Sequence, residues 1–465
     1  MKKTALILIS LIVASVAYAQ DITGQWNGLL KIQGTQLGVV LHISKSGSGY
    51  IITMDSPDQG AKDVPALSVS FEKSILKIEV AGGIYYQGTL TQDNQIVGEL
   101  RQSTFTLPLT FTRSTPEKEK IVRPQDPVKP YPYDTEEVSF KNPDDGAVLA
   151  GTLSLPSGEG VFPVVVLITG SGPQNRDEEL MGHKPFLVLA DYLTRKGIAV
   201  LRYDDRGTAK STGDFQKASS PVFAADVEAA INYLLTRKDI DKKKIGLIGH
   251  SEGGMIAPMV AAKNKDVSYL VLMAGTGIRG KELLLLQQEL IGRANGQTAE
   301  QLAKVHSDNQ GAFDLILNST NQETLKKALN AYILKRLKDV PADQKPAGVS
   351  DEAIAKQQMD QITSPWFQYF LKYDPSLVLS KVKCPVLALN GAKDLQVPPR
   401  ENLSAIKSGL EKGGNKKVTV REFPNLNHLF QECETGSPNE YGQIQQTISP
   451  QVLDEISEWI LRQTK

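Results

Sequence analysis

Short runs of alternating apolar and polar residues fill the first part of the chain after residue 20. Eight such runs lie at residues 26–30, 37–43, 50–54, 67–71, 75–80, 85–90, 95–100 and 105–111. Glycine, aspartate, asparagine and serine separate them, most clearly at residues 33–34, 46–49 and 93–94. Alternation with a period of two indicates half-buried strands, and turn residues at this spacing indicate antiparallel neighbours. The pattern predicts a small all-β barrel or sandwich domain over residues 20–113.

A proline-rich stretch follows at residues 114–134, with prolines at positions 116, 124, 127, 130 and 132 and charges of both signs. Prolines at this density favour an extended, semi-rigid spacer. We therefore place the domain boundary there and expect a second domain over residues 135–465.

Beyond residue 135, apolar runs alternate with amphipathic stretches. An opening hairpin is predicted at residues 138–140 and 149–155, and later strands at residues 164–168, 200–203, 244–248, 270–273, 386–389 and 418–423. Residues 221–237 carry apolar side chains at helical spacing. Strands that alternate with helices predict an α/β domain with a mostly parallel sheet and helices on both faces.

A mostly helical insertion interrupts this alternation at about residues 280–373. Its predicted helices lie at residues 281–294, 299–317 and 322–337. An insertion at this point of such a domain is expected to form a cap over the active site. The aromatic stretch at residues 365–370 has two interpretations, as a wall of the substrate pocket or as a seal between cap and core, and the sequence leaves both open.

The candidate nucleophile lies in the one G-x-S-x-G pentad of the chain, Gly249-His250-Ser251-Glu252-Gly253, where a predicted strand meets a predicted helix. A serine at such a turn takes a strained backbone conformation that exposes its hydroxyl, and the flanking glycines let strand and helix pass closely. The backbone N–H of Glu252 would then face a developing oxyanion. Because chance matches to the pattern are common, its strand–turn–helix context and its downstream partners decide its meaning.

The candidate base is found by elimination among five histidines. His42 lies in the β-rich part of the chain, and His250 adjoins the nucleophile. His183 and His306 lie in a predicted loop and in the helical insertion. His428 remains, in the loop after the last predicted strand.

The candidate acid is Asp394, three residues after the buried strand and glycine of residues 385–391. The chain order is therefore Ser251, Asp394, His428, that is, nucleophile, acid, base, each in a loop after a strand. A serine hydroxyl is a weak nucleophile that needs a base within hydrogen-bond reach. We expect His428 to take the proton of Ser251 while Asp394 orients the imidazole.

These residues and two further stretches give the chain a resemblance to a known superfamily. The further stretches are Leu167-Ile168-Thr169-Gly170-Ser171-Gly172-Pro173-Gln174-Asn175-Arg176-Asp177-Glu178 and Arg202-Tyr203-Asp204-Asp205-Arg206-Gly207. From about residue 136 to the end, the chain resembles an α/β-hydrolase of the serine-aminopeptidase-like (S33-type) and carboxylesterase branch, and is most similar to secreted bacterial esterases with an N-terminal β domain. The resemblance implies the α/β-hydrolase fold with a helical cap. One departure is Ala209, where glycine is more usual.

The resemblance also implies the second oxyanion donor, the backbone N–H of Ser171 in preference to that of Gly172. Residues 174–179 are expected to form an ion-pair and hydrogen-bond network that fixes this oxyanion loop, rather than to contact substrate. Asp205 and Arg206 are expected to form a structural pair beneath the active site.

The composition of the chain limits the kinds of binding partner and cofactor that we expect. Lysine plus arginine equals aspartate plus glutamate at 52 residues each, which indicates no nucleic-acid or anionic-membrane partner. No metal-ligand spacing and no phosphate-binding loop is found in the sequence, so neither a metal nor a cofactor is expected. Cys384 and Cys433 are too few for a disulfide framework, and whether they pair stays open.

Residues 1–19 have the form of a secretory signal peptide, with Lys2-Lys3, an apolar stretch at residues 5–16 and Ala17-Tyr18-Ala19 as the cleavage site. The apolar stretch is short for a membrane-spanning helix. We therefore predict an exported protein, periplasmic or extracellular, with no stable membrane span after cleavage before Gln20.

The sequence predicts an exported serine hydrolase, a carboxylesterase that cleaves small or short-chain acyl esters through an acyl-enzyme. The alternative is a serine peptidase or aminopeptidase with the same triad, since one fold hosts many functions; it would need an acidic anchor for a substrate amine or a large lid domain. A surface binding module with an inactive hydrolase domain is more remote, because the triad is intact. The acyl and alcohol groups, the role of the β domain and the oligomeric state are not determined by the sequence.

Overall fold

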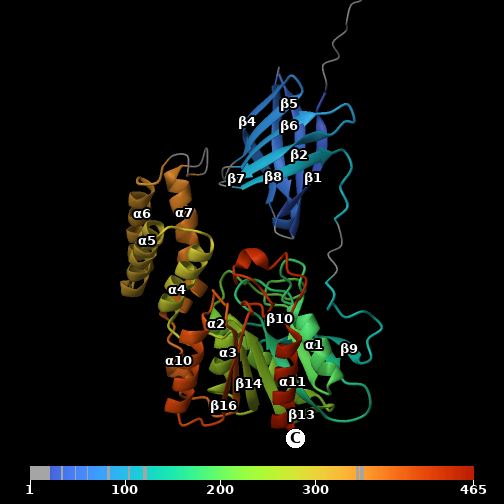
Figure 1. Cartoon of the computed structure of the whole chain (residues 1–465), viewed down its shortest axis with the longest axis vertical. Coiled ribbons are helices and arrows are strands. Elements are labelled where there is room, and N and C mark those ends of the chain that lie inside the picture. The colour runs from blue at the N-terminus through green and yellow to red at the C-terminus, as the bar shows by residue number, and fades with distance from the viewer. Residues whose placement is uncertain are drawn as a thin grey trace, which may run out of the picture. The chain divides into compact units, whose positions relative to one another are not determined.

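The computed structural model describes residues 21–32, 35–47, 49–59, 61–80, 84–102, 105–118, 123–341, 345 and 350–465. The predicted signal segment at residues 1–19 lies outside the described residues. The chain divides into two compact units, one built mainly from residues 36–118 and the other from residues 119–341 and 350–465. Figure 1 shows both units with most of their elements labelled.

The first unit is a closed barrel of eight strands in chain order. Its strands are β1 (Gly24–Ile32), β2 (Thr35–Ser46), β3 (Gly49–Ser56), β4 (Ala61–Glu72), β5 (Ile75–Val80), β6 (Ile84–Leu90), β7 (Ile96–Gln102) and β8 (Phe105–Thr112), with a 3₁₀ turn at Pro57–Gln59. The pairing of β1 with β8, Asn27 opposite Thr112, closes the barrel. Trp26 and Phe111 are among the buried side chains that fill its interior.

The second unit contains an eight-stranded sheet in the order β16-β15-β14-β13-β11-β12-β10-β9. The strands are β9 (Asp134–Lys141), β10 (Val148–Leu155), β11 (Phe162–Ile168), β12 (Ala199–Tyr203), β13 (Ile240–His250), β14 (Val267–Met273), β15 (Val386–Gly391) and β16 (Val418–Phe423). Strands β11 to β16 pair in parallel, whereas β9 and β10 run antiparallel at one edge. The α/β-hydrolase fold predicted from the sequence is confirmed.

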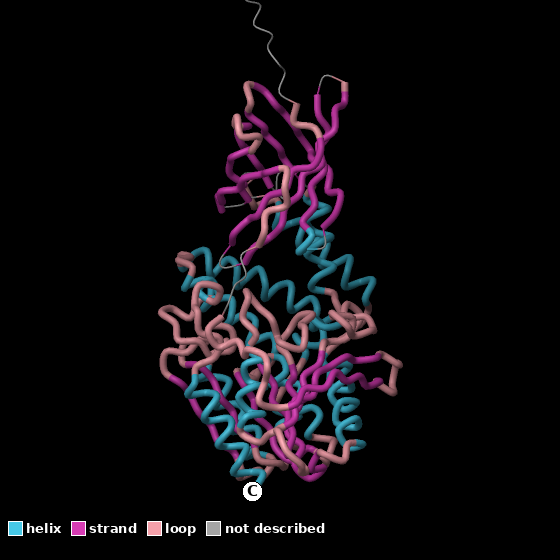
Figure 2. Tube along the Cα trace, turned by 90° about the vertical axis from the view of Figure 1, so that its right-hand side faces the viewer, coloured by secondary structure: helices cyan, strands magenta, loops and turns pink. Residues whose placement is uncertain are grey.

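Helices cover both faces of this sheet, as Figures 1 and 2 show. One face packs against α2 (Ser220–Thr236), α3 (Glu252–Ala261) and α10 (Pro399–Lys412), and the other against α1 (Pro185–Arg195) and α11 (Pro450–Thr464). Strands β11, β14 and β15 are mostly apolar, and β13 is buried from Ile245 onward, because both of their faces are covered. None of the described helices combines the length and the apolar character needed to cross a bilayer.

The insertion between β14 and β15 is helical, as its sequence predicts. It comprises α4 (Gly280–Ala294), α5 (Ala299–Asn318), α6 (Gln322–Leu337), α7 (Asp351–Ile362), α8 (Pro365–Lys372) and α9 (Ser376–Leu379). Phe313, Ile316, Leu325 and Leu329 form a hydrophobic cluster of its own, to which Leu371 of α8 contributes. The return segment α8 therefore links this cluster to the main core, where Phe370 is buried.

Part of the proline-rich stretch belongs to the second unit. Arg123 is buried and donates hydrogen bonds to the carbonyl oxygens of Met181, Gly442 and Ile444. Gln125 accepts from the backbone N–H of Thr447 at 2.6 Å. Residues from Arg123 onward are thus held against the hydrolase unit by specific contacts.

Candidate active site

The order of the strands brings three candidate loops to one edge of the sheet. Ser251 follows β13, Asp394 follows β15 and His428 follows β16, and the carboxyl ends of parallel strands meet at the same edge. Ser251 has φ 52° and ψ −113° at the start of α3, the strained turn expected of a nucleophile elbow. A Cβ at residue 249 would lie 2.0 Å from the Gly253 carbonyl oxygen, so only glycine fits there.

Asp394 and His428 form a buried hydrogen-bonded pair. Oδ2 of Asp394 lies 2.8 Å from Nδ1 of His428. Its other oxygen, Oδ1, accepts backbone N–H groups from Gln396 and Val397, each at 2.8 Å. Because both carboxylate oxygens are held as acceptors, Nδ1 of His428 carries the hydrogen and Nε2 is left as the basic nitrogen.

The Ser251 hydroxyl makes no hydrogen bond to any of the described residues, and neither does Nε2 of His428. The candidate nucleophile and the candidate base are brought to the same sheet edge but are not hydrogen-bonded to each other. Nucleophile–base hydrogen bonds are often long in unliganded sites. The adjacent residue, His250, does reach the base: its ring centroid lies 4.9 Å from that of His428.

The two predicted oxyanion donors are both uncommitted. The backbone N–H groups of Ser171 and Glu252 have no hydrogen-bond partner within the described part of the chain. The neighbouring N–H of Gly170 is already used, because it donates to Oε1 of Glu178 at 2.7 Å. Gly172, with φ 100°, turns the loop back after Ser171. Ser171 is therefore better placed than Gly170 to serve as the second donor.

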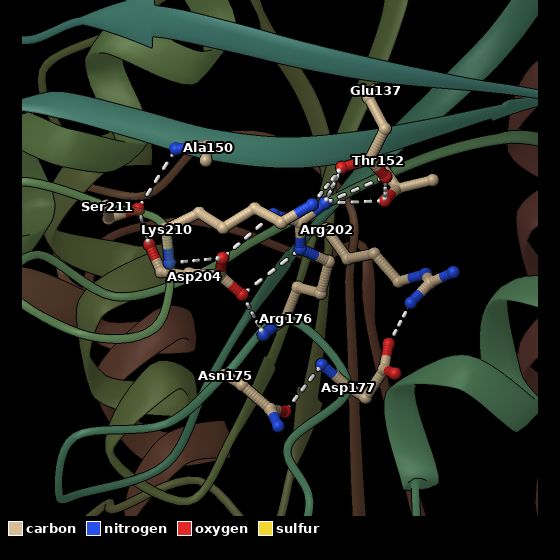
Figure 3. Close-up of polar contacts among 10 residues, drawn as sticks. All are labelled: Glu137, Ala150, Thr152, Asn175, Arg176, Asp177, Arg202, Asp204, Lys210 and Ser211. Carbon is tan, nitrogen blue, oxygen red and sulfur yellow. Dashed lines mark hydrogen bonds and ion pairs between the residues drawn. The ribbon is translucent and has the colours of Figure 1, made fainter.

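The network expected along residues 174–179 is present and centres on Arg176 (Figure 3). Its guanidinium makes a two-pronged contact with Asp204, at 3.1 Å from Nε and 2.8 Å from Nη2. The Nη1 nitrogen donates to Glu137 at 3.0 Å and to Thr152 at 2.8 Å. Arg202 pairs with Asp177 in the same cluster. Residues 169–184, between β11 and α1, form the oxyanion loop. The bonds of Arg176 and Asp177 tie this loop to β9, to β10 and to the end of β12.

The expected pair of Asp205 and Arg206 is not formed. Arg206 instead contacts Asp226, with Nη2 at 2.6 Å from Oδ1. Asp205 accepts from Thr169 Oγ1 at 2.8 Å and from the Gln174 N–H at 2.9 Å. Burial raises the pKa of Asp205 to about 8, and the neighbouring carboxyls of Glu252 and Glu178 also raise it.

Glu252 connects the nucleophile elbow to the helical insertion. Its Oε1 accepts from Ser220 Oγ at 2.7 Å and from Trp366 Nε1 at 2.8 Å. The carboxyl is buried, which raises its pKa. Trp366 also stacks on Phe370, with ring centroids 5.5 Å apart.

Of the two interpretations of the aromatic stretch of α8, its contacts support the seal between cap and core. The indole of Trp366 joins the helical insertion to Glu252, the residue after Ser251. Pro365 and Tyr369 instead line a groove of about 760 Å³. None of the candidate triad residues lines that groove, so it is distinct from the catalytic edge.

The other candidate groups have structural explanations. His183 is buried, with its ring nitrogens beside Thr447 Oγ1 and the Tyr441 carbonyl oxygen, and burial lowers its pKa to about 4. Cys384 and Cys433 are free thiols. Ala209 has φ 46°, a left-handed conformation that explains why glycine is usual there. No group of three histidine, cysteine or carboxylate side chains in the described ranges is arranged to hold a metal ion.

Sequence reasoning set His250 aside, and the structure places it in the site. A histidine beside the nucleophile and an acidic residue, Glu178, in the oxyanion loop were the available signals. In the sequence, neither residue by itself indicates that the two side chains form a pair.

Comparison with known proteins gives three kinds of match. Residues 145–418 match the family model described as X-Pro dipeptidyl-peptidase (S15 family), a span that includes Ser251 and Asp394 and ends before His428. Esterase EstD of Thermotoga maritima is 29% identical over 317 residues, which cover 68% of this chain and 66%, just under two thirds, of that protein. Human acyl-coenzyme A thioesterase 1 is 29% identical over 128 residues, 27% of each chain. A solved esterase of Pyrococcus furiosus aligns with 14% identity and a TM-score of 0.43, over 74% of this chain and 99% of that one.

Proposed function

Because the chain belongs to the X-Pro dipeptidyl-peptidase (S15) family within the α/β-hydrolase superfamily, we propose that it is a serine hydrolase that cleaves small or short-chain carboxylic esters. The observation that carries the proposal is the buried Asp394–His428 pair at the same sheet edge as the strained Ser251 turn. A carboxylate, an imidazole and a partly exposed serine in this arrangement suit acyl transfer.

In the proposed reaction, Nε2 of His428 takes the proton of Ser251 as Oγ attacks the ester carbonyl carbon. The electron pair of the C=O bond moves to the oxygen, which the N–H groups of Glu252 and Ser171 stabilise. Collapse of this intermediate breaks the bond to the alcohol, which leaves with the proton held by His428. Water, deprotonated by His428, then hydrolyses the acyl-enzyme on Ser251 and releases the acid.

The family description favours a second candidate, a peptidase that binds the amino end of its substrate. Such an enzyme needs an acidic anchor for the substrate amine. Glu252 is the carboxyl next to the nucleophile, and its Oε1 is engaged by Ser220 and Trp366. A carboxyl held by two neutral donors in a buried site is poorly suited to bind an ammonium group, so we favour ester hydrolysis, the activity named for EstD.

A substrate panel tests this proposal. The purified protein should hydrolyse p-nitrophenyl acetate and butyrate, and Ser251→Ala should abolish the activity. Aminoacyl and X-Pro anilides should be turned over at least about tenfold more slowly in kcat/KM. Efficient cleavage of the anilides, with esters the poorer substrates, would instead establish the peptidase.

Export is part of the proposal, supported by the signal-like composition of residues 1–19. Mass spectrometry of the protein isolated from its native cells should find a chain that starts at Gln20. A chain that retains residues 1–19 in the cytoplasm would contradict export without affecting the proposed chemistry.

A further inference from the structure

A second histidine–carboxylate pair lies beside the Asp394–His428 pair. Nδ1 of His250 is 3.0 Å from Oε1 of Glu178, and Nε2 of His250 is 3.0 Å from the backbone oxygen of His428. The side chains of His250 and Glu178 are only 8% and 7% exposed, so water does not satisfy their polar atoms. The pair therefore lies between the base and the protein interior.

Three loops converge on this pair. Oε1 of Glu178 also accepts the backbone N–H of Gly170 in the oxyanion loop, at 2.7 Å. His250 belongs to the nucleophile elbow, and its ring contacts the base loop through His428. Glu178 itself has φ 51°, a left-handed conformation that costs a non-glycine residue energy and persists where contacts around it compensate.

The contacts of His250 determine its protonation. The carbonyl oxygen of His428 can only accept, so Nε2 of His250 must carry a hydrogen. Oε1 of Glu178 also accepts the Gly170 N–H, a contact typical of a carboxylate, and toward a carboxylate oxygen Nδ1 of His250 can only donate. An imidazole with hydrogens on both nitrogens is an imidazolium, and its counter-charge is the Glu178 carboxylate.

We propose that Glu178 and His250 are positioning residues for the proposed hydrolase: a buried carboxylate–imidazolium pair that locks the oxyanion, nucleophile and base loops together and holds a positive charge beside His428. The inference rests on the proposed function, because it assigns His428 as the base. Burial by itself lowers the pKa of His250, but the charge and hydrogen bond of Glu178 outweigh it, so the pKa is raised.

The positive charge has a consequence for catalysis. The ionisable groups that face His250 are Glu178 from the oxyanion loop, His428 from the loop after β16 and Asp394 from the loop after β15. The His250 ring lies 4.9 Å from the His428 ring, centroid to centroid, whereas Glu178 contacts His250 at its other nitrogen, Nδ1. An imidazolium at this place repels a second positive charge on the His428 ring.

Histidine NMR tests the pair without reference to activity. The chain has only five histidines, so selective ¹⁵N-histidine labelling gives few signals, and loss of one signal in His250→Gln assigns His250. In the wild-type protein His250 should remain an imidazolium at pH 7.5, about one unit above the pKa of a free imidazole. A neutral His250 at that pH overturns the inference, whether or not any variant folds.

The kinetic test uses a matched pair of substitutions. Glu178→Gln keeps an acceptor for Gly170 but removes the counter-charge, so His250 becomes neutral. The acid limb of the kcat/KM profile should move to higher pH by about one unit, and kcat should fall about tenfold. Glu159→Gln, in the exposed loop between β10 and β11, makes the same chemical change at a remote site and should leave both unchanged.

The outcomes separate this inference from the proposed function. A loss of kcat with an unmoved acid limb, or no change in either, contradicts the electrostatic role of the pair. A wild-type protein that hydrolyses no ester and is not labelled at Ser251 contradicts the proposed function instead. In that case the NMR result still decides whether the imidazolium exists.

Discussion

Two histidine–carboxylate pairs lie side by side in this molecule, and they differ in one respect. In the Asp394–His428 pair, Nδ1 is bonded and Nε2 has no partner among the described residues. In the Glu178–His250 pair, both ring nitrogens are bonded to acceptors. The first histidine can therefore exchange a proton with a reacting group, whereas the second has no nitrogen left to do so.

The difference shows that residue types alone do not distinguish a histidine that can act as a catalytic base from a histidine that only holds loops in place. Both histidines are buried, and each is held by a buried carboxyl group. What distinguishes them is the carbonyl oxygen of His428, which occupies the second nitrogen of His250. We thus expect the same kind of substitution to have very different effects in the two pairs.

The largest effect should come from the proposed proton-transfer groups. Ser251→Ala and His428→Ala should each lower kcat for a p-nitrophenyl ester by about 10³-fold or more, and the double variant should be no worse than either alone. Circular dichroism should show an unchanged fold. If His428→Ala keeps more than about a tenth of the wild-type rate, the base is another residue.

Amide substitutions compare the two pairs directly. Asp394→Asn should lower kcat by about 10³-fold or more, since it disturbs the tautomer of the base. Glu178→Gln should cost about tenfold, because it alters only the surroundings of that base. Equal losses in steady-state assays of the two variants would remove the distinction between them.

A third buried carboxyl, Glu252, sharpens the comparison because its partners are neutral. Trp366→Phe removes its 2.8 Å hydrogen bond from the indole and should lower the free energy of unfolding by about 1–3 kcal/mol. Activity should fall only a few fold, about 2–5-fold, as the elbow loosens. Tyr369→Phe on the groove side of α8 is the control and should leave urea denaturation unchanged; equal destabilisation by both would assign the effect to α8 as a whole.

The smallest effect concerns Asp205, a buried carboxyl near the carboxyls of Glu252 and Glu178. Its pKa of about 8 lies above the ordinary value of 3.8, so the folded protein keeps a proton that the unfolded chain releases. This contribution to stability is fully present below pH 3.8 and is lost as pH rises through about 8. Asp205→Asn lacks this loss, so its melting temperature relative to wild type should rise by several degrees, roughly 4–8 °C, between pH 5 and pH 9. A constant difference across that range would show that Asp205 is ionised throughout.

Much of the fold could be predicted because its signals are local. Strand β5 (Ile75–Val80) and helix α6 (Gln322–Leu337) have the bounds that their hydrophobic patterns predict. Closure of the barrel could not be predicted, because it depends on pairing β1 with β8 across almost the whole first unit. The alternation of apolar and polar residues predicts a strand, but it does not identify the strand that pairs with it.

The candidate site divides in the same way. Ser251, Asp394 and His428 could be selected because each follows a strand and the order along the chain is informative. The role of His250 could not, because Glu178 lies 72 residues earlier and reaches it only through the pairing of β11 with β13. Asp205 and Arg206 do not pair because they lie in the loop after β12, where each side chain has its own partner, Thr169 for Asp205 and Asp226 for Arg206.

The central claim is that Ser251 is the acylated nucleophile. Incubation of the wild-type protein with a fluorophosphonate, followed by intact-mass and peptide mass spectrometry, tests it most directly. One adduct per chain on the peptide that contains Ser251, prevented by excess ester substrate and absent in Ser251→Ala, is the expected result. An adduct on a different residue, or full esterase activity in a protein that is not labelled, would contradict the account.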